Sequence, residues 1–429
     1  MGYRETIEFL YRQLPAYHRI GKAAYKNDLG NSIALDEYFC HPHRQFSSIH
    51  VAGTNGKGSV SHFTASVLQE AGFRTGLYTS PHLRDFRERI RINGEMIPKR
   101  EVTAFVRNHS AIIRSLNPSF FEMTVALAFD FFARNKVDVA VVETGLGGRL
   151  DSTNIITPVL SVITNIGRDH MDLLGETPRQ IALEKAGIIK PDIPVVIGEK
   201  QSSVYDVFVK KAEEVNSSIS FADENYSCKA GAVDYITGER SVEISGPEPG
   251  EQYNVQTRLA GDYQARNLAT LFEVIRILRG SYSISEGNII SGVRNVTDNT
   301  GLMGRWQIIG NNPLTICDTG HNREGLEYVV SQLKSLNREG LHIVLGFVND
   351  KDLGSILPVF PGDAKYYFTK ASIPRALDEK KLQAEAGNFG LKGKSYSKVS
   401  RALAAARREA RQDDVIFVGG STFVVAEVV

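Results

Sequence analysis

Short apolar runs alternate along the chain with stretches in which apolar residues recur every three or four positions. Such runs are typical of buried strands, and such stretches are typical of amphipathic helices. The strand-like runs are 46–52, 137–142 and 159–164, and the helix-like segments are 60–71, 121–133 and 177–189. This alternation predicts a wound α/β sheet with helices on both faces.

A second alternation begins near residue 300, after a polar, glycine-bearing stretch at 291–304. Its strand-like runs are 314–317, 342–346, 365–369 and 415–419. Because 429 residues exceed what one hydrophobic core usually organises, we expect two domains. Residues 1–300 would form a P-loop-containing wound sheet, with polar strand-like pieces at about 202–260 as an added β layer. Residues 301–429 would form a smaller Rossmann-like α/β domain.

The turn after the first strand has the composition of a phosphate-binding loop. It consists of Gly53, Thr54, Asn55, Gly56, Lys57, Gly58 and Ser59. Glycines let backbone N–H groups turn toward a polyphosphate, the following helix N-terminus favours negative charge, and Lys57 can reach the outer phosphates. Val51 and Gly58 stand where the common pattern has its first glycine and its serine or threonine. The alternative is a glycine-rich turn that serves only the strand-to-helix geometry.

Two side chains follow later strands and would lie at the same edge of the sheet. Glu143 ends an apolar run and His170 follows the next one. Ligands bind beyond the carboxyl ends of strands in such sheets, and a carboxylate there suits Mg²⁺ held together with a nucleotide. A single histidine is more often structural than a metal ligand.

Lys185 is unusual because it shares an otherwise apolar helical face with Ile181 and Ile188. The residues alone favour the simple account, in which the aliphatic stem lies on the protein and the ammonium group reaches solvent.

Composition removes several classes of function. Fifty basic and 49 acidic residues leave a net charge of +1, so the charge of the whole chain does not indicate binding to nucleic acid or to a membrane. Cys40, Cys228 and Cys317 are few and far apart, as in reduced cytosolic proteins. No apolar run reaches membrane-spanning length. We therefore expect a cytoplasmic protein that acts on small molecules.

Several segments in a fixed order carry a resemblance to a known family. They are 53–59, Ser80-Pro-His-Leu83, 86–93, Glu143-Thr-Gly-Leu-Gly-Gly-Arg-Leu-Asp151, Glu184-Lys-Ala-Gly187, Gly261-Asp-Tyr-Gln-Ala-Arg-Asn267, Gly304-Arg305, Asp318-Thr-Gly-His-Asn322 and Gly419-Gly-Ser421. Together they resemble the folylpolyglutamate synthase and dihydrofolate synthase family, within the Mur-type amide ligases. Thr319, Arg323 and Tyr263 stand where that family usually has Ala, Pro and His.

The resemblance implies roles for individual residues. The loop 53–59 would bind ATP phosphates, Asn267 would contact adenine, and Arg305 with Asp318 would close on the nucleotide. Ser80, Glu143, His170 and a carbamylated Lys185 would hold two Mg²⁺ ions, with a monovalent cation as a further cofactor.

The substrate contacts that the resemblance implies are less specific. Candidates for the folate are Phe86, Phe120, Phe121, Glu122 and Asp151, and candidates for the incoming glutamate are His321 and Ser421. An aromatic pair that opens an apolar helix is as often core as ligand site. Arg87, Glu88, Arg89 and Arg91 lie near the expected site, with a solvated charged face as the alternative.

The expected activity is ATP-dependent addition of L-glutamate to dihydropteroate or a tetrahydrofolyl-glutamate through an acyl phosphate, by a monomeric enzyme. One alternative is a Mur ligase that acts on a cell-wall precursor, although its loop would usually carry Thr or Ser after Lys57. Another is a nucleotide-binding switch without ligase turnover, which would leave Glu143, His170 and Lys185 unexplained.

Overall fold

The structure is a computed structural model that describes residues 2–14 and 28–429. The chain divides into two compact units, which we call unit 1 and unit 2. Unit 1 holds the chain up to Lys229 together with Val242–Val255 and Ala265–Gly301. Unit 2 holds Ala230–Ser241, Gln256–Gln264 and Leu302–Val429. The two short segments of unit 2 that precede residue 301 were not predicted from the sequence.

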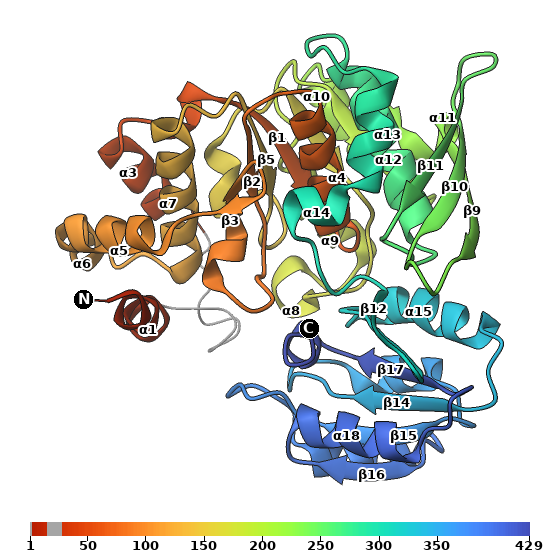
Figure 1. The fold of residues 1–429 in the computed structure, drawn as a ribbon. Coiled ribbons are helices and arrows are strands. Elements are labelled where there is room, and N and C mark those ends of the chain that lie inside the picture. The colour runs from red at the N-terminus through yellow and green to blue at the C-terminus, as the bar shows by residue number, and fades with distance from the viewer. Residues whose placement is uncertain (1, 15–27) are drawn as a thin grey trace. The chain divides into compact units, whose positions relative to one another are not determined.

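Unit 1 is built on an eight-stranded sheet with the order β4-β3-β2-β5-β1-β6-β7-β8. Figure 1 labels β1, β2, β3 and β5 of this sheet. The strands are β1 (Ser47–Ala52), β2 (Thr75–Tyr78), β3 (Ile90–Ile92), β4 (Glu95–Met96), β5 (Val139–Glu143), β6 (Leu160–Ile163), β7 (Val195–Ile197) and β8 (Ile219–Phe221). All neighbours pair in parallel except β2 with β3 and β3 with β4, which are antiparallel. The predicted strands at 46–52, 137–142 and 159–164 are confirmed as β1, β5 and β6.

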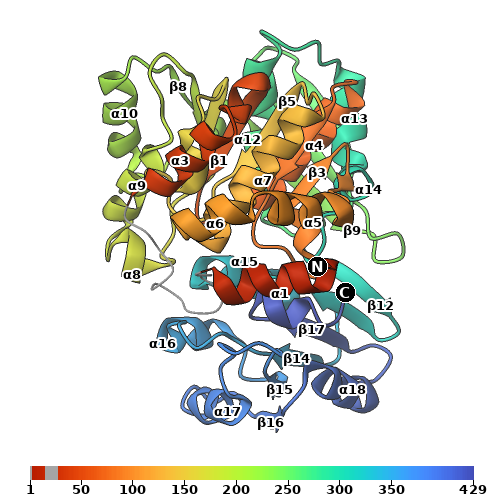
Figure 2. The ribbon, with the colours of Figure 1, turned by 90° about the vertical axis from the view of Figure 1, so that its left-hand side faces the viewer.

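Helices cover both faces of this sheet. They are α1 (Tyr3–Gln13), α3 (Gly30–Tyr38), α4 (Lys57–Glu70), α5 (Lys99–Asn108), α6 (Ser110–Leu116), α7 (Phe120–Arg134), α8 (Met171–Leu174), α9 (Pro178–Ala186), α10 (Tyr205–Glu214), α11 (Ala222–Asn225), α12 (Gln264–Leu278), α13 (Glu286–Arg294) and α14 (Val296–Thr300), with short 3₁₀ turns η2 (Pro42–Gln45), η3 (Phe86–Arg89) and η4 (Ser152–Ile155). Figures 1 and 2 show α3 and α7 on one face and α4, α13 and α14 on the other. Because both faces are covered, the central strands are buried along their whole length, as their continuous apolar runs predicted.

Three further strands form a separate small sheet. They are β9 (Ser227–Val233), β10 (Arg240–Ser245) and β11 (Gln252–Thr257), in the order β11-β10-β9. Their side chains alternate between buried and exposed positions, which explains the polar, strand-like pattern of this part of the chain.

Unit 2 contains a six-stranded sheet with the order β12-β13-β17-β14-β15-β16. The strands are β12 (Gln307–Asn311), β13 (Leu314–Cys317), β14 (Leu341–Leu345), β15 (Lys365–Thr369), β16 (Gly393–Tyr396) and β17 (Val415–Gly419), and the helices are α15 (Arg323–Ser335), α16 (Leu353–Ile356), η5 (Leu357–Val359), α17 (Glu379–Gly387), α18 (Val399–Glu409) and α19 (Thr422–Val425). Only β12 pairs antiparallel. Helices α15 and α18 lie on opposite faces (Figures 1 and 2). The predicted α/β fold with two sheets is confirmed.

Strand register brings three loops of unit 1 together. The β1 residue Val51 lies beside Glu143 of β5 and beside Val162 of β6. Backbone hydrogen bonds continue the pairing past the strand ends, since Thr144 N donates to Val51 O and Thr164 N donates to Ala52 O, both at 2.9 Å. The loops after β1, β5 and β6 therefore leave one edge of the sheet side by side.

Candidate active site

Glycine geometry fixes the loop that follows β1. Gly53 has a φ of 147° and Gly56 a φ of 86°, both in the range that L side chains rarely adopt. A Cβ atom at Gly53 would lie 1.8 Å from Thr164 Oγ1, and one at Gly56 would lie 2.3 Å from Asn267 Oδ1. The loop thus packs directly against the end of β6, and Asn267 of α12 lies against it within unit 1. Sequence reasoning missed Thr164 as the support of this loop.

The remaining loop residues are held by backbone and side-chain contacts. Thr54 Oγ1 donates to Gly167 O at 3.2 Å, and Asn55 N donates to Asn165 Oδ1 at 2.9 Å. Helix α4 starts at Lys57, so Gly58 and the buried Ser59 lie in its first turn. Its N-terminus therefore follows the glycine turn directly, as an anion-binding helix requires.

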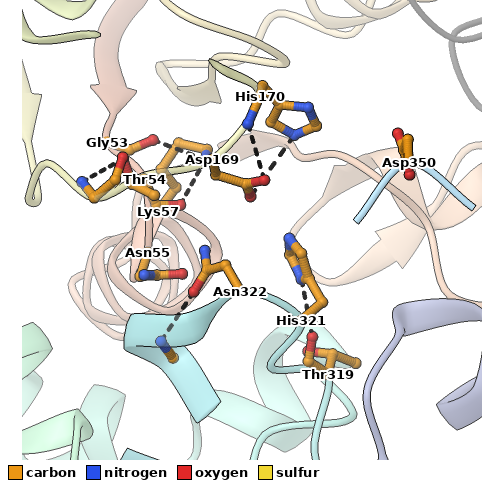
Figure 3. Close-up of polar contacts among 12 residues, drawn as sticks. Gly53, Thr54, Asn55, Lys57, Asp169, His170, Thr319, His321, Asn322 and Asp350 are labelled. Carbon is orange, nitrogen blue, oxygen red and sulfur yellow. Dashed lines mark hydrogen bonds and ion pairs between the residues drawn. The ribbon is translucent and has the colours of Figure 1, made fainter. Parts of the chain in front are cut away.

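Two lysine side chains meet at one carbonyl oxygen of the loop. Lys57 Nζ donates to Gly53 O at 2.9 Å and to Thr54 O at 3.2 Å (Figure 3). Lys185 Nζ, from α9, donates to the same Gly53 O at 2.8 Å. The Lys185 side chain is only 3% exposed, so the prediction that its ammonium group reaches solvent is wrong. Helix α9 also ends at Ala186, earlier than predicted, so Ile188 is buried outside it.

This environment changes the chemistry of Lys185. Burial first, and the nearby Lys57 ammonium second, lower the pKa of Lys185 to about 7. Asp169 and Asp151 oppose that shift without cancelling it. Near neutral pH a large fraction of the Lys185 amine is therefore uncharged and able to act as a nucleophile.

The candidate metal ligands lie at the ends of the neighbouring strands. Glu143 ends β5, its side chain is buried, and its Oε2 accepts a hydrogen bond of 3.0 Å from the Ser80 backbone N–H. His170 has a left-handed φ of 52°, and its backbone N–H donates to Asp169 Oδ1 at 3.0 Å (Figure 3). Within the described ranges, no group of three or more His, Cys, Asp and Glu side chains converges on one point. Mg²⁺ bound with a nucleotide needs only one or two protein ligands, and the buried oxygen donor at Glu143 fits it.

An aromatic cluster with one buried cation lies beside η3. Phe120, at the start of α7, stacks on Tyr11 with ring centroids 5.0 Å apart and meets Phe86 edge-on at 5.8 Å. Arg89 Cζ lies 5.3 Å from the Phe120 ring centroid, and Arg89 Nε donates to His82 Nδ1 at 2.7 Å. Arg89 is only 5% exposed. The alternative of a solvated charged face is therefore wrong for Arg89, and Tyr11 was missed by sequence reasoning.

Three candidate substrate residues have clear local roles. Glu122 forms a capping box with Ser119 at the start of α7, Asp151 accepts hydrogen bonds from Thr153 N and Leu146 N, and Ser421 caps α19. Each is buried. These side chains shape the loops at the carboxyl ends of the strands. Phe121 packs there as well, because its ring would lie 2.3 Å from a Cβ atom at Gly145.

In unit 2 the candidate residues Asp318 and His321 follow β13, and Arg305 precedes β12. Asp318 is buried and accepts hydrogen bonds from Tyr263 Oη, Trp306 N and Gly320 N. Arg305 donates to Thr319 Oγ1. His321 Nδ1 lies 3.1 Å from Thr319 O, and Asn322 Oδ1 caps α15 through Gly325 N (Figure 3).

Family profiles match both halves of the chain. The Mur ligase middle domain matches residues 51–274, and the Mur ligase glutamate ligase domain matches residues 304–422. The chain belongs to the Mur ligase family. Within it, the folylpolyglutamate synthase of Lacticaseibacillus casei is 32% identical over 440 residues, which cover 100% of this chain and 98% of that protein.

Two other comparisons extend this result. A Haloferax volcanii protein with the name "Probable bifunctional folylpolyglutamate synthase/dihydropteroate synthase" is 32% identical, and the chain spans 50% of its length. The Escherichia coli enzyme in complex with DHPP and ADP has a TM-score of 0.84 and 27% identity, with 100% of this chain and 97% of that chain covered. This Mur ligase is thus an ATP-dependent ligase of the folylpolyglutamate synthase/dihydrofolate synthase branch. No helix in residues 2–14 and 28–429 has the length and apolar character needed to cross a membrane.

Proposed function

We propose that this Mur ligase joins L-glutamate to dihydropteroate, to a tetrahydrofolyl-glutamate, or to both. The observation that carries the proposal is the phosphate loop, in which Lys57 and Lys185 meet at Gly53 O next to the strand that ends in Glu143. The names of the Lacticaseibacillus casei relative and the DHPP in the Escherichia coli complex support a folate-type acceptor.

The reaction has two steps. The acceptor carboxylate takes the γ-phosphoryl group of ATP, which releases ADP and forms an acyl phosphate. The α-amine of glutamate then attacks the acyl carbon, and the tetrahedral intermediate expels phosphate as the amide forms. Residues 1–300 would bind ATP and folate, and residues 301–429 would bind glutamate and complete the nucleotide site, with His321 and Ser421 as glutamate contacts.

The protein contributes position and charge to these steps. On nucleotide binding, Lys57 would leave the carbonyls of Gly53 and Thr54 and donate to the outer phosphates. Asn267, already packed against Gly56, would contact the adenine, and Arg305 and Asp318 would meet the nucleotide from unit 2. Phe121, which is half-buried, would offer aromatic surface to a pterin. Phe86 and Phe120 are buried in the core beside it, and Glu122 and Asp151 hold the loops around it.

Mg²⁺, when bound, neutralises charge on the transferring phosphoryl group. Ser80, Glu143 and His170 would hold it. The amine of Lys185 adds to CO₂ and loses one proton, so a carbamylated Lys185 would supply a carboxylate for a second ion. The uncharged fraction of the buried amine supports this modification, because only a neutral amine attacks CO₂.

The test is phosphate release from ATP with Mg²⁺ and L-glutamate in the presence of dihydropteroate, of tetrahydrofolate, or of neither. We expect release to depend on an acceptor and the product to gain the mass of one glutamyl residue. A glutamyl mass increase on both acceptors identifies a bifunctional enzyme, and an increase on only one acceptor identifies the specificity of the enzyme. Turnover on neither acceptor would contradict the proposal. We also propose that the enzyme is cytoplasmic and that it is a monomer. Sedimentation in the presence and absence of ATP would check the monomeric state.

A further inference from the structure

The Asp318 carboxylate is almost fully engaged by groups of unit 2. Its Oδ2 accepts from Tyr263 Oη at 2.6 Å and from Trp306 N at 2.7 Å, and its Oδ1 accepts from Gly320 N at 2.7 Å. A carboxylate offers about four acceptor positions, two on each oxygen. The three bonds therefore leave one position, on Oδ1. Asp318 is 2% exposed, so that position can serve only a donor that approaches it directly.

The backbone next to Arg305 is distorted in a way that serves the same carboxylate. Trp306 has a φ of 47°, a left-handed conformation that a bulky residue rarely adopts. Its side chain is nonetheless 1% exposed and packs in the core of unit 2. This conformation directs Trp306 N–H to Asp318 Oδ2. Strained residues of this kind persist where the surrounding structure requires them, often at functional sites.

Tyr263 reaches Asp318 from a different part of the chain. It lies shortly before the passage of the chain into unit 1 at Ala265, and Trp306 lies shortly after its return to unit 2 at Leu302. A residue next to each of these two crossings therefore donates a hydrogen bond to Asp318. A buried tyrosine usually finds some partner for its hydroxyl, so the bond alone could be structural. What distinguishes Tyr263 is its acceptor, a buried carboxylate beside Arg305, at the carboxyl end of a parallel strand.

The chemistry of a nucleotide limits what the last acceptor position can bind. A carboxylate repels phosphate, so the remaining donors of ATP are the adenine amino group, for which Asn267 is the proposed contact, and the ribose hydroxyls. We propose that Tyr263 is a positioning residue of the nucleotide site, whose hydroxyl, together with Trp306 N–H, fixes Asp318 so that Oδ1 accepts a ribose hydroxyl of ATP. This inference rests on the proposed contact between Asp318 and the nucleotide.

The test replaces the hydroxyl and keeps the ring. In Tyr263→Phe we expect the KM for ATP and the Kd for ADP to rise about tenfold, with kcat within about twofold, because a hydrogen bond to a charged group is lost. Tyr366→Phe is the matched control. It removes another buried tyrosine hydroxyl of unit 2, which donates to Pro361 O at 2.6 Å, and should leave both constants unchanged. Equal constants for Tyr263→Phe and the unaltered enzyme would overturn the proposal.

Ribose analogues give a readout that a structural role would not move. The unaltered enzyme should have a lower KM for ATP than for 2′-deoxy-ATP or 3′-deoxy-ATP, and Tyr263→Phe should reduce that preference toward one. Equal KM values for ATP and both analogues in the unaltered enzyme would overturn the proposal, even if Tyr263→Phe failed to fold.

A third variant separates this inference from the function on which it rests. If Asp318→Asn weakens ADP binding while Tyr263→Phe does not, only the role of Tyr263 fails. If Asp318→Asn binds ADP normally, the proposed nucleotide contact of Asp318 fails and takes this inference with it.

The pH dependence of kcat/KM gives a further test, because the direction of its change can be predicted. Burial raises the pKa of Asp318, while Tyr263 and Arg305 oppose the rise, and the Cys317 thiol is the other titratable neighbour. Loss of the Tyr263 hydroxyl should therefore move the acid limb of kcat/KM for ATP to higher pH.

Discussion

The phosphate loop of unit 1 and the Asp318 region of unit 2 are held by different means. The loop takes its shape from glycine backbone angles and from strand register, and Gly53 and Gly56 leave no room for a side chain. The Asp318 carboxylate takes its orientation from Tyr263, 55 residues away in the chain, and from Trp306, 12 residues away. A site made by local backbone geometry is visible in a contiguous motif, whereas a site made by side-chain hydrogen bonds appears only after folding.

The largest expected effect tests the backbone side of this comparison. Gly53→Ala places a Cβ atom 1.8 Å from Thr164 Oγ1, so the loop must move. We expect a loss of about 100-fold or more in kcat/KM for ATP, because misplaced phosphate contacts cost transition-state stabilisation. Gly72→Ala is the control, since Gly72 also has a positive φ (86°, against 147° at Gly53) but nothing within 4 Å of the added atom. Equal activities of the two variants, both checked by circular dichroism, would contradict a loop fixed by packing.

The second prediction concerns the lysine at the same loop. Lys185→Met keeps the length of an apolar stem and removes the amine, so carbamylation and its metal contact are lost. We expect kcat to fall about 100-fold, in line with the loss of a charge-stabilising group. The unaltered enzyme, but not the variant, should lose activity in CO₂-free buffer and regain it with bicarbonate. Mass spectrometry of the native protein should find one added CO₂ only in the unaltered enzyme.

Lys185→Met should lower activity but raise the thermal stability of the protein. The pKa of Lys185 is about 7 in the folded protein against an ordinary 10.5, so between these values the unfolded chain binds the extra proton. In CO₂-free buffer the unaltered protein therefore gains stability as pH rises from about 7 toward 10.5, and the cost of the buried charge is fully present below about 7. We expect Lys185→Met to melt a few degrees higher at about pH 6, with the difference shrinking by about pH 9. If the Lys185 amine were exposed and its pKa ordinary, calorimetry would show a difference in melting temperature that does not change with pH.

The smallest effect belongs to a cap in unit 2. Ser421 Oγ accepts from Phe423 N at 3.1 Å and from Val424 N at 3.3 Å, which leaves its hydroxyl proton for a ligand. Ser421→Ala should reduce the free energy of unfolding by about 1 kcal/mol through the lost cap. It should also raise the KM for glutamate a few-fold, whereas Ser421→Thr should restore both. A loss of stability with an unchanged KM would leave Ser421 as a cap alone.

Sequence reasoning reached the parts of the site that depend on local order. The apolar runs predicted β1, β5 and β6, and the glycine motif placed Lys57 after a strand and before a helix. It failed for Lys185, for which the sequence favoured an exposed ammonium. The structure instead buries that amine on Gly53 O, because α9 packs its apolar face against the end of the sheet.

The sequence by itself determined the alternation of strands and helices, the phosphate loop and the family, because periodicity and short motifs are properties of neighbouring residues. Only the tertiary structure decided which side chains bind the same acceptor and which lie beside a buried charged group. Lys57 and Lys185 meet at one carbonyl, Arg89 is buried against Phe120, and Tyr263 holds Asp318. These contacts join residues far apart in the chain, and burial gives them their strength by excluding the water that would otherwise screen them.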